Sequence, residues 1–305
     1  MTDNTTPAEA VIIIPHHNDV TRLKLCLETL LPQTKGRPVE IVVVDNASTV
    51  DISDVKSAFP KVRFLDQPEK GAGLARNMGV SQTSAPRLFF TDSDCVPDGN
   101  WVATAFAIGD EDKITGGPVK TFDEDARPKT GAQAFETVFA FPFEDYIKRQ
   151  KFTGTVNLIT TRAVFDATGP FRAGGLEDKV WCHQAGALGY KVHWEPDLLV
   201  HHPTRKDFAA LRRKWKANTR AAYVLSGAGL TNRLLWFLRA VVVAASGVAH
   251  QIKVFRHPDL TIGEKLAAGF TLLRLRWLRA VWMLGQLRYS PQQRQDGQCQ
   301  DRRAV

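Results

Sequence analysis

Two aspartates directly behind a short apolar run give the first indication of chemistry. Asp92 and Asp94 flank Ser93 and follow the run at 88–90. Two residues apart at a strand end, their carboxylates come to share a face. Converging carboxylates repel each other unless a cation neutralises them. A hard divalent ion such as Mg²⁺ or Mn²⁺, itself bound to a diphosphate, would do so. A solvated turn with a helix cap is the alternative for these aspartates alone.

A second pair of carboxylates follows a glycine-rich loop. Glu177 and Asp178 come after Gly174 and Gly175 and directly before a predicted helix at 180–188. Such a pair suits a general base that removes a proton from an acceptor hydroxyl. Acidic residues also favour a helix N-terminus for electrostatic reasons alone. These residues by themselves leave both interpretations open.

Polar residues at two other predicted strand ends could contact a nucleotide or a metal ion. Asp45 follows the apolar run at 41–44, where its carboxylate could accept hydrogen bonds from a nucleobase or ribose, or cap a turn. His201 and His202 follow the run at 198–200. A neutral imidazole there could ligate a metal ion, although a surface or core histidine is the commoner case.

The segment from Gly71 to Asn77 places Arg76 close to a predicted helix start. Helix-start amides together with an arginine suit phosphate groups or sugar hydroxyls, and a plain loop is the alternative. The segment is not a dinucleotide fingerprint, because Arg76 stands where that pattern has its third glycine.

Strands and helices alternate along the first part of the chain. Apolar runs predict strands at 11–14, 41–44, 62–65 and 88–90, the first closed by Pro15, and periodic segments predict helices at 19–31 and 73–81. This alternation predicts an α/β fold with a mostly parallel central sheet and helices on both faces. Ligands then bind beyond the carboxyl ends of the strands. Residues 112–155 break the alternation, and we expect them to pack over the sheet and build an acceptor side.

The length and the cysteines narrow the class of protein. The 305 residues suffice for one large α/β domain with an appendage. The four cysteines show no metal-ligand or disulfide spacing, and they indicate reduced thiols in a cytosolic compartment: Cys26, Cys95, Cys182 and Cys299. Residues 1–10 lack a positively charged start followed by an apolar core, so we expect no secretory signal.

The charge is distributed unevenly along the chain. Residues 201–305 hold 19 Lys and Arg against five Asp and Glu, a net charge of +14, whereas residues 1–200 carry −6. A strongly basic segment suits an anionic partner such as a phospholipid surface. We expect no nucleic-acid partner, because the basic residues lie among bulky apolar ones without a reading motif.

The basic segment is also apolar. Its charge-free run at 240–249 is short for a membrane span of about 20 residues. In the last predicted helix, one face collects Leu266, Phe270, Leu273, Trp277, Val281 and Leu284. We expect a helix pair in the membrane interface whose arginines reach lipid phosphates. A helical bundle packed on the domain or on a second subunit is the alternative.

Five ordered motifs together resemble those of the family 2 glycosyltransferases, which are inverting enzymes with the GT-A fold. The similar segments are 13–18, 43–48, 71–77, 90–94 and 175–178, and a histidine behind the run at 198–200 fits the family's third metal ligand. The resemblance covers about residues 10–220. It implies the GT-A nucleotide-diphospho-sugar transferase fold with a C-terminal helical extension.

The resemblance also implies a role for each matching residue. Asp178 would be the catalytic base, with Glu177 beside it orienting the acceptor. Asp94 and His202 would ligate a divalent cation, Mn²⁺ or Mg²⁺; His202 is preferred to His201 because the family's histidine tends to fall two residues past the strand. The remaining matching residues would bind substrate: Pro15, Asn18, Asp45, Arg76, Asn77, Asp92 and Ser93.

The activity implied is metal-dependent, inverting transfer of one sugar, of the hexosyltransferase class. The donor would be a nucleotide-diphospho-sugar, and the acceptor a glycan or polyprenyl-linked saccharide in envelope or exopolysaccharide synthesis. Processive polymerisation is not expected, because residues 211–215 depart from the family's Gln-x-x-Arg-Trp segment. We expect a cytoplasmic protein, peripheral on the inner face of the cell membrane, or a homodimer through its C-terminal helices.

The expected organisation is an N-terminal tail at 1–9, a catalytic domain at 10–203, a helical extension at 204–290 and a disordered tail at 291–305. Two other functions compete. A sugar-phosphate nucleotidyltransferase would carry a Gly-rich, Lys-bearing loop at 15–18, which this chain lacks. A non-catalytic nucleotide-sugar sensor or membrane scaffold would have no need of Asp94, Asp178 and His202.

Overall fold

The computed structural model describes residues 7–108 and 113–288. The chain divides into two compact units. The first unit takes in the chain up to Lys120 together with Phe141–Pro203, and the second takes in Thr121–Ala140 and the chain from Thr204 onward. The tail expected at 291–305 and Cys299 lie outside the described residues.

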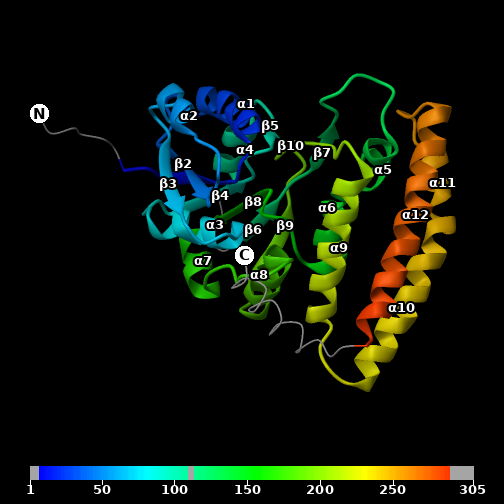
Figure 1. Ribbon diagram of the computed structural model, residues 1–305. Coiled ribbons are helices and arrows are strands. Elements are labelled where there is room, and N and C mark those ends of the chain that lie inside the picture. The colour runs from blue at the N-terminus through cyan, green and yellow to red at the C-terminus, as the bar shows by residue number, and fades with distance from the viewer. Residues whose placement is uncertain (1–6, 109–112, 289–305) are drawn as a thin grey trace, which may run out of the picture. The chain divides into compact units, whose positions relative to one another are not determined.

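A seven-stranded sheet forms the centre of the first unit (Figure 1). The strand order is β3-β2-β1-β4-β8-β6-β9. The strands are β1 (Ala10–His16), β2 (Val39–Asn46), β3 (Arg63–Gln67), β4 (Arg87–Thr91), β6 (Lys113–Gly116), β8 (Asn157–Thr161) and β9 (Lys191–Trp194). Strand β8 runs antiparallel to both its neighbours, while the other pairings are parallel. The predicted mostly parallel sheet is therefore confirmed.

Two apolar layers cover the faces of this sheet. Because side chains alternate along β1, Ile12 and Ile14 belong to one core, and Val11 and Ile13 belong to the other. The first core takes residues from α1 (Val20–Leu30), α2 (Ser53–Ala58) and α4 (Trp101–Ala107). The second takes residues from α3 (Ala72–Ser81), α7 (Arg162–Thr168) and α8 (Glu177–Ala187). Helices lie on both faces, as the alternation predicts.

Pro15 lies inside β1, so the expectation that it closes this strand is wrong. Strand β1 pairs with β2 as far as His16, but its pairing with β4 ends at Ile13. The missing N–H of Pro15 therefore falls beyond the residues that pair with β4. The side chain of Pro15 is buried in the sheet.

A second, three-stranded sheet has the order β5-β10-β7. Its strands are β5 (Val96–Pro97), β7 (Val119–Phe122) and β10 (Val200–Pro203), with β5 and β10 antiparallel. The strand predicted at 198–200 is shifted along the chain, because β10 begins at Val200 and contains both His201 and His202. They therefore point to opposite faces of it. Between β7 and β8 lie α5 (Gly131–Phe139), α6 (Phe143–Asp145) and a π-helical turn, Tyr146–Gln150.

The second unit is helical. Besides α5 it holds α9 (Phe208–Leu225), α10 (Leu230–Ala249), α11 (Gln251–Phe255) and α12 (Ile262–Gln286). Apolar residues of α5, α9 and α12 form one buried cluster. Residues 121–140 therefore belong with these helices, and the expectation that the whole of 112–155 packs over the sheet is wrong.

The expectation that the C-terminal segment is too short for a membrane span also needs correction. Among the described helices, Leu230–Phe255 is long and apolar enough to cross a membrane, judged by length and composition alone. The charge-free run at 240–249 is only the middle part of this helix. The apolar helix extends beyond the charged residues on either side of that run.

The close approach of α3 to the sheet yields a stability prediction. A Cβ atom on Gly79 would lie 2.6 Å from Cγ2 of Ile13. We expect Gly79→Ala to lower the free energy of unfolding by about 1–3 kcal/mol, the usual cost of overpacking a core. Gly186→Ala is the matched control, because a Cβ there meets nothing within 4 Å. That variant should be neutral or more stable in urea denaturation. Equal effects of the two changes would contradict this view of the packing.

Candidate functional site

Arg76 joins three elements at the carboxyl edge of the main sheet. This arginine of α3 is only 4% exposed. Its Nη2 donates to Oδ1 of Asp92, just past β4, at 2.5 Å, and its Nη1 lies 3.6 Å from Oε1 of Glu177, at the start of α8. A buried guanidinium needs such partners, because desolvating an unpaired charge is costly. Arg76 thereby neutralises Asp92 and Glu177, two carboxylates that are far apart along the sequence.

Asp178 lies next to this ion cluster. It is in the first turn of α8, and its Oδ1 accepts a 2.7 Å hydrogen bond from the Lys179 amide. The predicted helix at 180–188 thus begins earlier, at Glu177, and includes both carboxylates. Burial raises the pKa of Asp178 to about 6. The negative charges of Glu177 and Asp92 act in the same direction, while the Lys179 amide and Arg76 oppose it.

The absence of a side chain at Gly154 allows the chain to pack closely against Asp178. A Cβ atom on Gly154 would lie 2.5 Å from Cζ of Phe143 and 3.3 Å from Oδ2 of Asp178. The chain at residue 154 therefore approaches the carboxylate more closely than a larger residue would permit. The sequence analysis did not identify Gly154, because nothing local to it indicates this long-range approach.

Asp94 and His202 face each other. Oδ2 of Asp94 and Nε2 of His202 are 3.3 Å apart, with side-chain exposures of 31% and 8%. Nδ1 of His202 lies 2.7 Å from the carbonyl oxygen of Pro203. Because a carbonyl only accepts, Nδ1 carries a proton. In neutral His202 the lone pair of Nε2 is therefore directed at the carboxylate. The neighbouring His201 lies instead near Asp98, with 3.9 Å between Nε2 and Oδ2.

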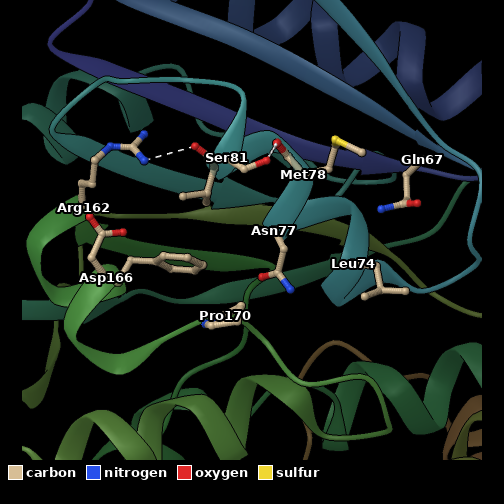
Figure 2. Close-up of a pocket in the computed structure, with 10 residues that line it drawn as sticks. Gln67, Leu74, Asn77, Met78, Ser81, Arg162, Asp166 and Pro170 are labelled. Carbon is tan, nitrogen blue, oxygen red and sulfur yellow. Dashed lines mark hydrogen bonds between the residues drawn. The ribbon is translucent and has the colours of Figure 1, made fainter.

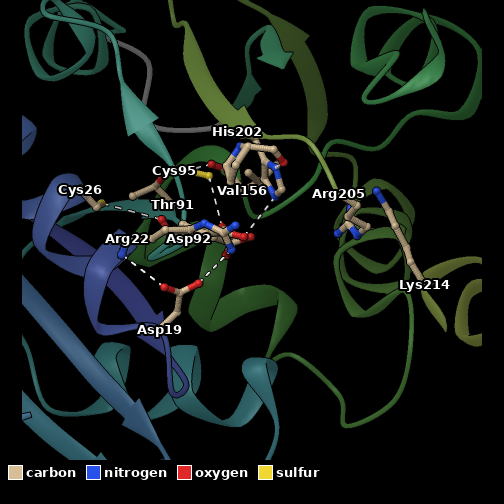
Figure 3. A network of polar contacts seen from close by, with 12 residues as sticks. Asp19, Arg22, Cys26, Thr91, Asp92, Cys95, Val156, His202, Arg205 and Lys214 are labelled. Atoms are coloured by element: carbon tan, nitrogen blue, oxygen red, sulfur yellow. Dashed lines mark hydrogen bonds and ion pairs between the residues drawn. The ribbon is translucent and has the colours of Figure 1, made fainter. Parts of the chain in front are cut away.

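The segment after β4 keeps an alternating pattern. Asp92 and Asp94 are half-buried, whereas Ser93 between them is buried. The Asp92 carbonyl accepts from the Cys95 amide at 3.1 Å, which closes a turn, and the Cys26 thiol points at the same carbonyl (Figure 3). The two aspartates thus share the accessible side, as their spacing predicts. The Ser93 side chain turns inward, away from that side.

Asn18 holds the chain behind β2. It has a left-handed backbone, with φ of 62°. Its Oδ1 accepts from the amides of Thr49 and Val50 at 2.7 and 3.3 Å, and its own amide donates to Ser48 Oγ at 2.9 Å. The Ser48 hydroxyl in turn donates to Oδ1 of Asp45. Asn18 therefore positions the loop that carries Asp45, a contribution that the motif resemblance did not indicate.

His17 and Lys70 belong to the same edge and were missed by the sequence analysis. Nδ1 of His17 donates to the Asn46 carbonyl at 2.9 Å. Its Nε2 is thus an acceptor and lies 3.1 Å from Nζ of Lys70. Oδ1 of Asn46 also accepts from the Gly71 amide at 2.7 Å. The sequence did contain a signal for Lys70, because this residue directly precedes the segment at 71–77.

Asn77 has a different environment from Arg76. Its amide donates to the Phe171 carbonyl at 2.8 Å and accepts from the Phe171 amide at 2.9 Å. It also lines a pocket of about 420 Å³ between α3 and α7 (Figure 2). Asp92, Asp94 and Asp178 do not line this pocket. The geometry gives Asn77 a structural part in holding the chain before α8.

No group of three or more His, Cys, Asp or Glu side chains suited to a metal ion occurs within residues 7–108 and 113–288. Asp94 and His202 are two neighbouring side chains of types that can ligate a metal ion, 3.3 Å apart. The three described cysteines do not add to the set, because Cys26, Cys95 and Cys182 are buried thiols whose pKa values burial raises.

A comparison with protein families identifies the family of this chain. The sequence model described as "Glycosyl transferase family 2" matches residues 11–168. The chain belongs to glycosyl transferase family 2. The matched region holds the ends of β1, β2 and β4 but stops before Asp178 and His202. The protein is a glycosyltransferase, as the resemblance of its motifs implies.

Known proteins agree with this assignment. Glycosyltransferase AglE of Haloferax volcanii is 28% identical over 220 residues, 67% of this chain and 70% of AglE. Glycosyltransferase GlyG of Streptococcus pneumoniae is 33% identical over 100 residues, 31% of this chain and 33% of GlyG. Among solved structures, GalNAc-T7 with UDP, GalNAc and Mn²⁺ aligns with a TM-score of 0.50 at 18% identity. That alignment covers 64% of this chain and 43% of the GalNAc-T7 chain. The fold is GT-A.

The ion cluster yields a prediction about stability. We expect Arg76→Met to lower the free energy of unfolding by about 3 kcal/mol, because it leaves Asp92 and Glu177 without their common cation. Urea denaturation at pH 7 measures the loss.

Arg63→Met is the control for that experiment. Arg63 pairs with Glu40 at 3.2 Å, but its side chain is 44% exposed. Exposed pairs contribute about 0–1 kcal/mol. If the two variants lose the same stability, Arg76 does not have the part assigned to it.

Proposed function

We propose that this glycosyltransferase transfers one sugar from a nucleotide-diphospho-sugar to an acceptor hydroxyl, with inversion and with help from a divalent cation. One observation carries the proposal. At one sheet edge, a buried arginine gathers Asp92 and Glu177, and Asp178 with its raised pKa stands beside them. A proton acceptor and an acidic, cation-attracting surface are the two groups that such a transfer requires.

In this proposal the donor lies across the ends of β1, β2 and β4. Asp45 accepts hydrogen bonds from the base or ribose, and Asn18 and Ser48 hold it there. Asp92, which Arg76 fixes, faces the ribose or sugar. Pro15 is buried in β1, so its contribution is to shape the start of the loop. The GalNAc-T7 structure, which holds UDP, GalNAc and Mn²⁺, is in line with a donor and cation of this kind.

Asp94 and His202 are the residues that would hold the cation. The donor set fits one, because the Nε2 lone pair and the Asp94 carboxylate face each other at 3.3 Å. Two such acceptors need a proton or a metal ion between them. The hydrogen bond from Nδ1 to the Pro203 carbonyl also suits a ligating imidazole, which commonly donates its other N–H to a carbonyl. A bound Mn²⁺ or Mg²⁺ would offset the charge on the leaving diphosphate.

Asp178 acts as the base in the proposed reaction. It takes the proton of the acceptor hydroxyl while the oxygen bonds to the anomeric carbon of the donor sugar. The bond from that carbon to the diphosphate breaks, and the nucleoside diphosphate leaves with the electron pair. A pKa of about 6 favours this role, since Asp178 is ionised at pH 7 yet more basic than an ordinary aspartate. Glu177 holds Arg76 and lies beside the acceptor.

The acceptor and the location of the protein remain proposals from the sequence. A glycan or polyprenyl-linked saccharide, in envelope or exopolysaccharide synthesis at the inner face of the cell membrane, suits the +14 charge of residues 201–305. Single addition is preferred to processive synthesis. A sensor without catalysis is the competing function, and the raised pKa of Asp178 disfavours it, since such shifts gather at catalytic groups.

Asp178→Asn tests the assignment of the base. Transfer should fall by a factor of about 10² or more, the usual scale for a lost proton acceptor, while donor binding persists. In the wild type, transfer should decline about tenfold per pH unit below about 6, as Asp178 becomes protonated. Transfer rates across pH 5–8 measure both effects. A variant that transfers at nearly the wild-type rate would show that another group accepts the proton.

The raised pKa of Asp178 also predicts how Asp178→Asn changes the stability of the fold. Because the pKa of Asp178 is raised above the ordinary value of 3.8 for an aspartate, the folded state binds the proton more tightly than the unfolded state. This group therefore removes stability as pH rises from about 4 to 6. Asp178→Asn should be at least as stable as the wild type at pH 7, so misfolding would not explain its lost activity.

Asp94→Ala tests the cation site. Calorimetric titration with UDP, GDP and their sugars should detect Mn²⁺-dependent binding in the wild type and none in the variant. His202→Ala should weaken the same binding by a factor of about 10–100, because it removes a ligand and its orienting hydrogen bond. His201→Ala is the control and should bind as the wild type does. Unchanged nucleotide affinity in Asp94→Ala would rule out this cation site.

A further inference from the structure

The outer face of α12 is a continuous apolar stripe. Its members are Ile262, Leu266, Phe270, Leu273, Trp277, Val281 and Leu284, and each is between 42% and 78% exposed. They recur every three or four residues, so they follow one line along the helix. At a rise of 1.5 Å per residue this line is roughly 33 Å long. The stripe is too long and too regular to be scattered surface residues.

Helix α10 packs beside α12 (Figure 1) and adds to this surface. Its buried stripe is narrow and consists of Trp236, Ala240, Val243 and Gly247. The rest of the helix is exposed and still largely apolar, with Leu230, Leu234, Leu238, Val241 and Val248 between 49% and 84% exposed. A helix that is apolar on nearly all sides needs surroundings other than water.

The buried side of α12 packs on α9 through apolar residues and through arginines that lie over aromatic rings. Cζ of Arg274 lies 4.0 Å from the ring centre of Phe208, and Cζ of Arg279 lies 4.2 Å from that of Trp215. Leu211 of α9 belongs to the same buried cluster as Leu272 and Leu275 of α12. The two helices therefore share one packed core within this unit. If α12 crossed a membrane, it would carry its arginines and the basic side chains of α9 into the hydrocarbon, which is costly.

We infer that α10 and α12 lie in the plane of an anionic lipid bilayer, with the exposed apolar stripe of α12 and the neighbouring face of α10 among the acyl chains. The long apolar helix Leu230–Phe255 then rests on the membrane and does not span it. This inference is independent of the chemistry proposed for the catalytic unit.

The charge around the apolar face of α10 and α12 indicates that an anionic lipid surface covers this face. Around the apolar face, exposed basic side chains include Arg233, Arg239, Lys253, Arg256 and Arg288. Acidic side chains are scarce in these helices: Glu264 is buried and accepts from the amides of Lys129 and Thr261. Basic groups beside an apolar face attract lipid phosphates, while the apolar face supplies burial that salt does not screen. A second copy of the same surface would bring like charges together.

Vesicle flotation of the full-length protein tests the surface. The protein should float with vesicles of phosphatidylcholine and phosphatidylglycerol, and far less with phosphatidylcholine alone. Phe270→Glu should reduce the bound fraction at least tenfold, because it places a charge in the stripe. Leu188→Glu is the matched control, since Leu188 is 58% exposed but belongs to the first unit. It should bind as the wild type does.

A second measurement tests the orientation. Trp277 is 66% exposed in the middle of the stripe. Its fluorescence, taken as the difference between the wild type and Trp277→Phe, should be quenched by lipids brominated near the headgroup more than by lipids brominated near the chain end. A wash with alkaline carbonate should release the bound protein, as expected for a helix pair that does not cross the bilayer.

Three results would overturn the inference. Failure of the wild type to float would remove the membrane as the occupant. A dimer in sedimentation that Phe270→Glu dissociates, with no flotation, would assign the stripe to a second copy of the chain. Protein that stays in the vesicles through the carbonate wash would show that the helices span the bilayer.

Discussion

The catalytic unit depends on the neutralisation of carboxylates that parallel strands bring to one edge of a sheet. Arg76 does this from inside the protein, and it can be buried only because Asp92 and Glu177 flank it. Gly73, earlier on the same helix, permits the approach: a Cβ there would lie 3.3 Å from the Cβ of Phe171 and 3.7 Å from Cγ of Glu177. The single guanidinium thus holds α3, the end of β4 and α8 at the distances that the site needs.

Much of this edge could be predicted from sequence, because the signals are local. An apolar run followed by Asp92 and Asp94 gives both the strand and its end, and the spacing of the two aspartates gives their common face. The order of several such ends follows from the alternation of strands and helices. The partners across the site have no local signal. Asn77 bonds to Phe171, 94 residues away, and arginine is a residue that sequence analysis expects at the surface.

The second unit shows a different limit. Periodicity detects that a helix has an apolar face, but it does not say which face the protein covers. Helix α12 is apolar on two sides: Leu272 and Leu275 are buried against α5 and α9, whereas the cleaner stripe through Phe270 and Trp277 is exposed. The association of residues 121–140 with α12 has the same cause. A pairing over more than a hundred residues depends on tertiary packing and leaves no pattern within either segment.

Glu177 and Asp178, at the start of α8, have different electrostatic environments: Glu177 pairs with Arg76, and Asp178 has a raised pKa. A proton acceptor needs a raised pKa, and a neighbouring arginine would lower it. In this structure Arg76 makes its ion pairs with Asp92 and Glu177, while the hydrogen bond that opposes burial at Asp178 is the one from the Lys179 amide. Burial therefore outweighs the opposing influences, and the pKa of Asp178 stays near 6. If Glu177 did not hold Arg76, the guanidinium would be free to turn toward Asp178 and would make it a weaker base. In the proposed reaction, the residue that keeps Asp178 an effective base is thus its neighbour Glu177, which acts by pairing with Arg76.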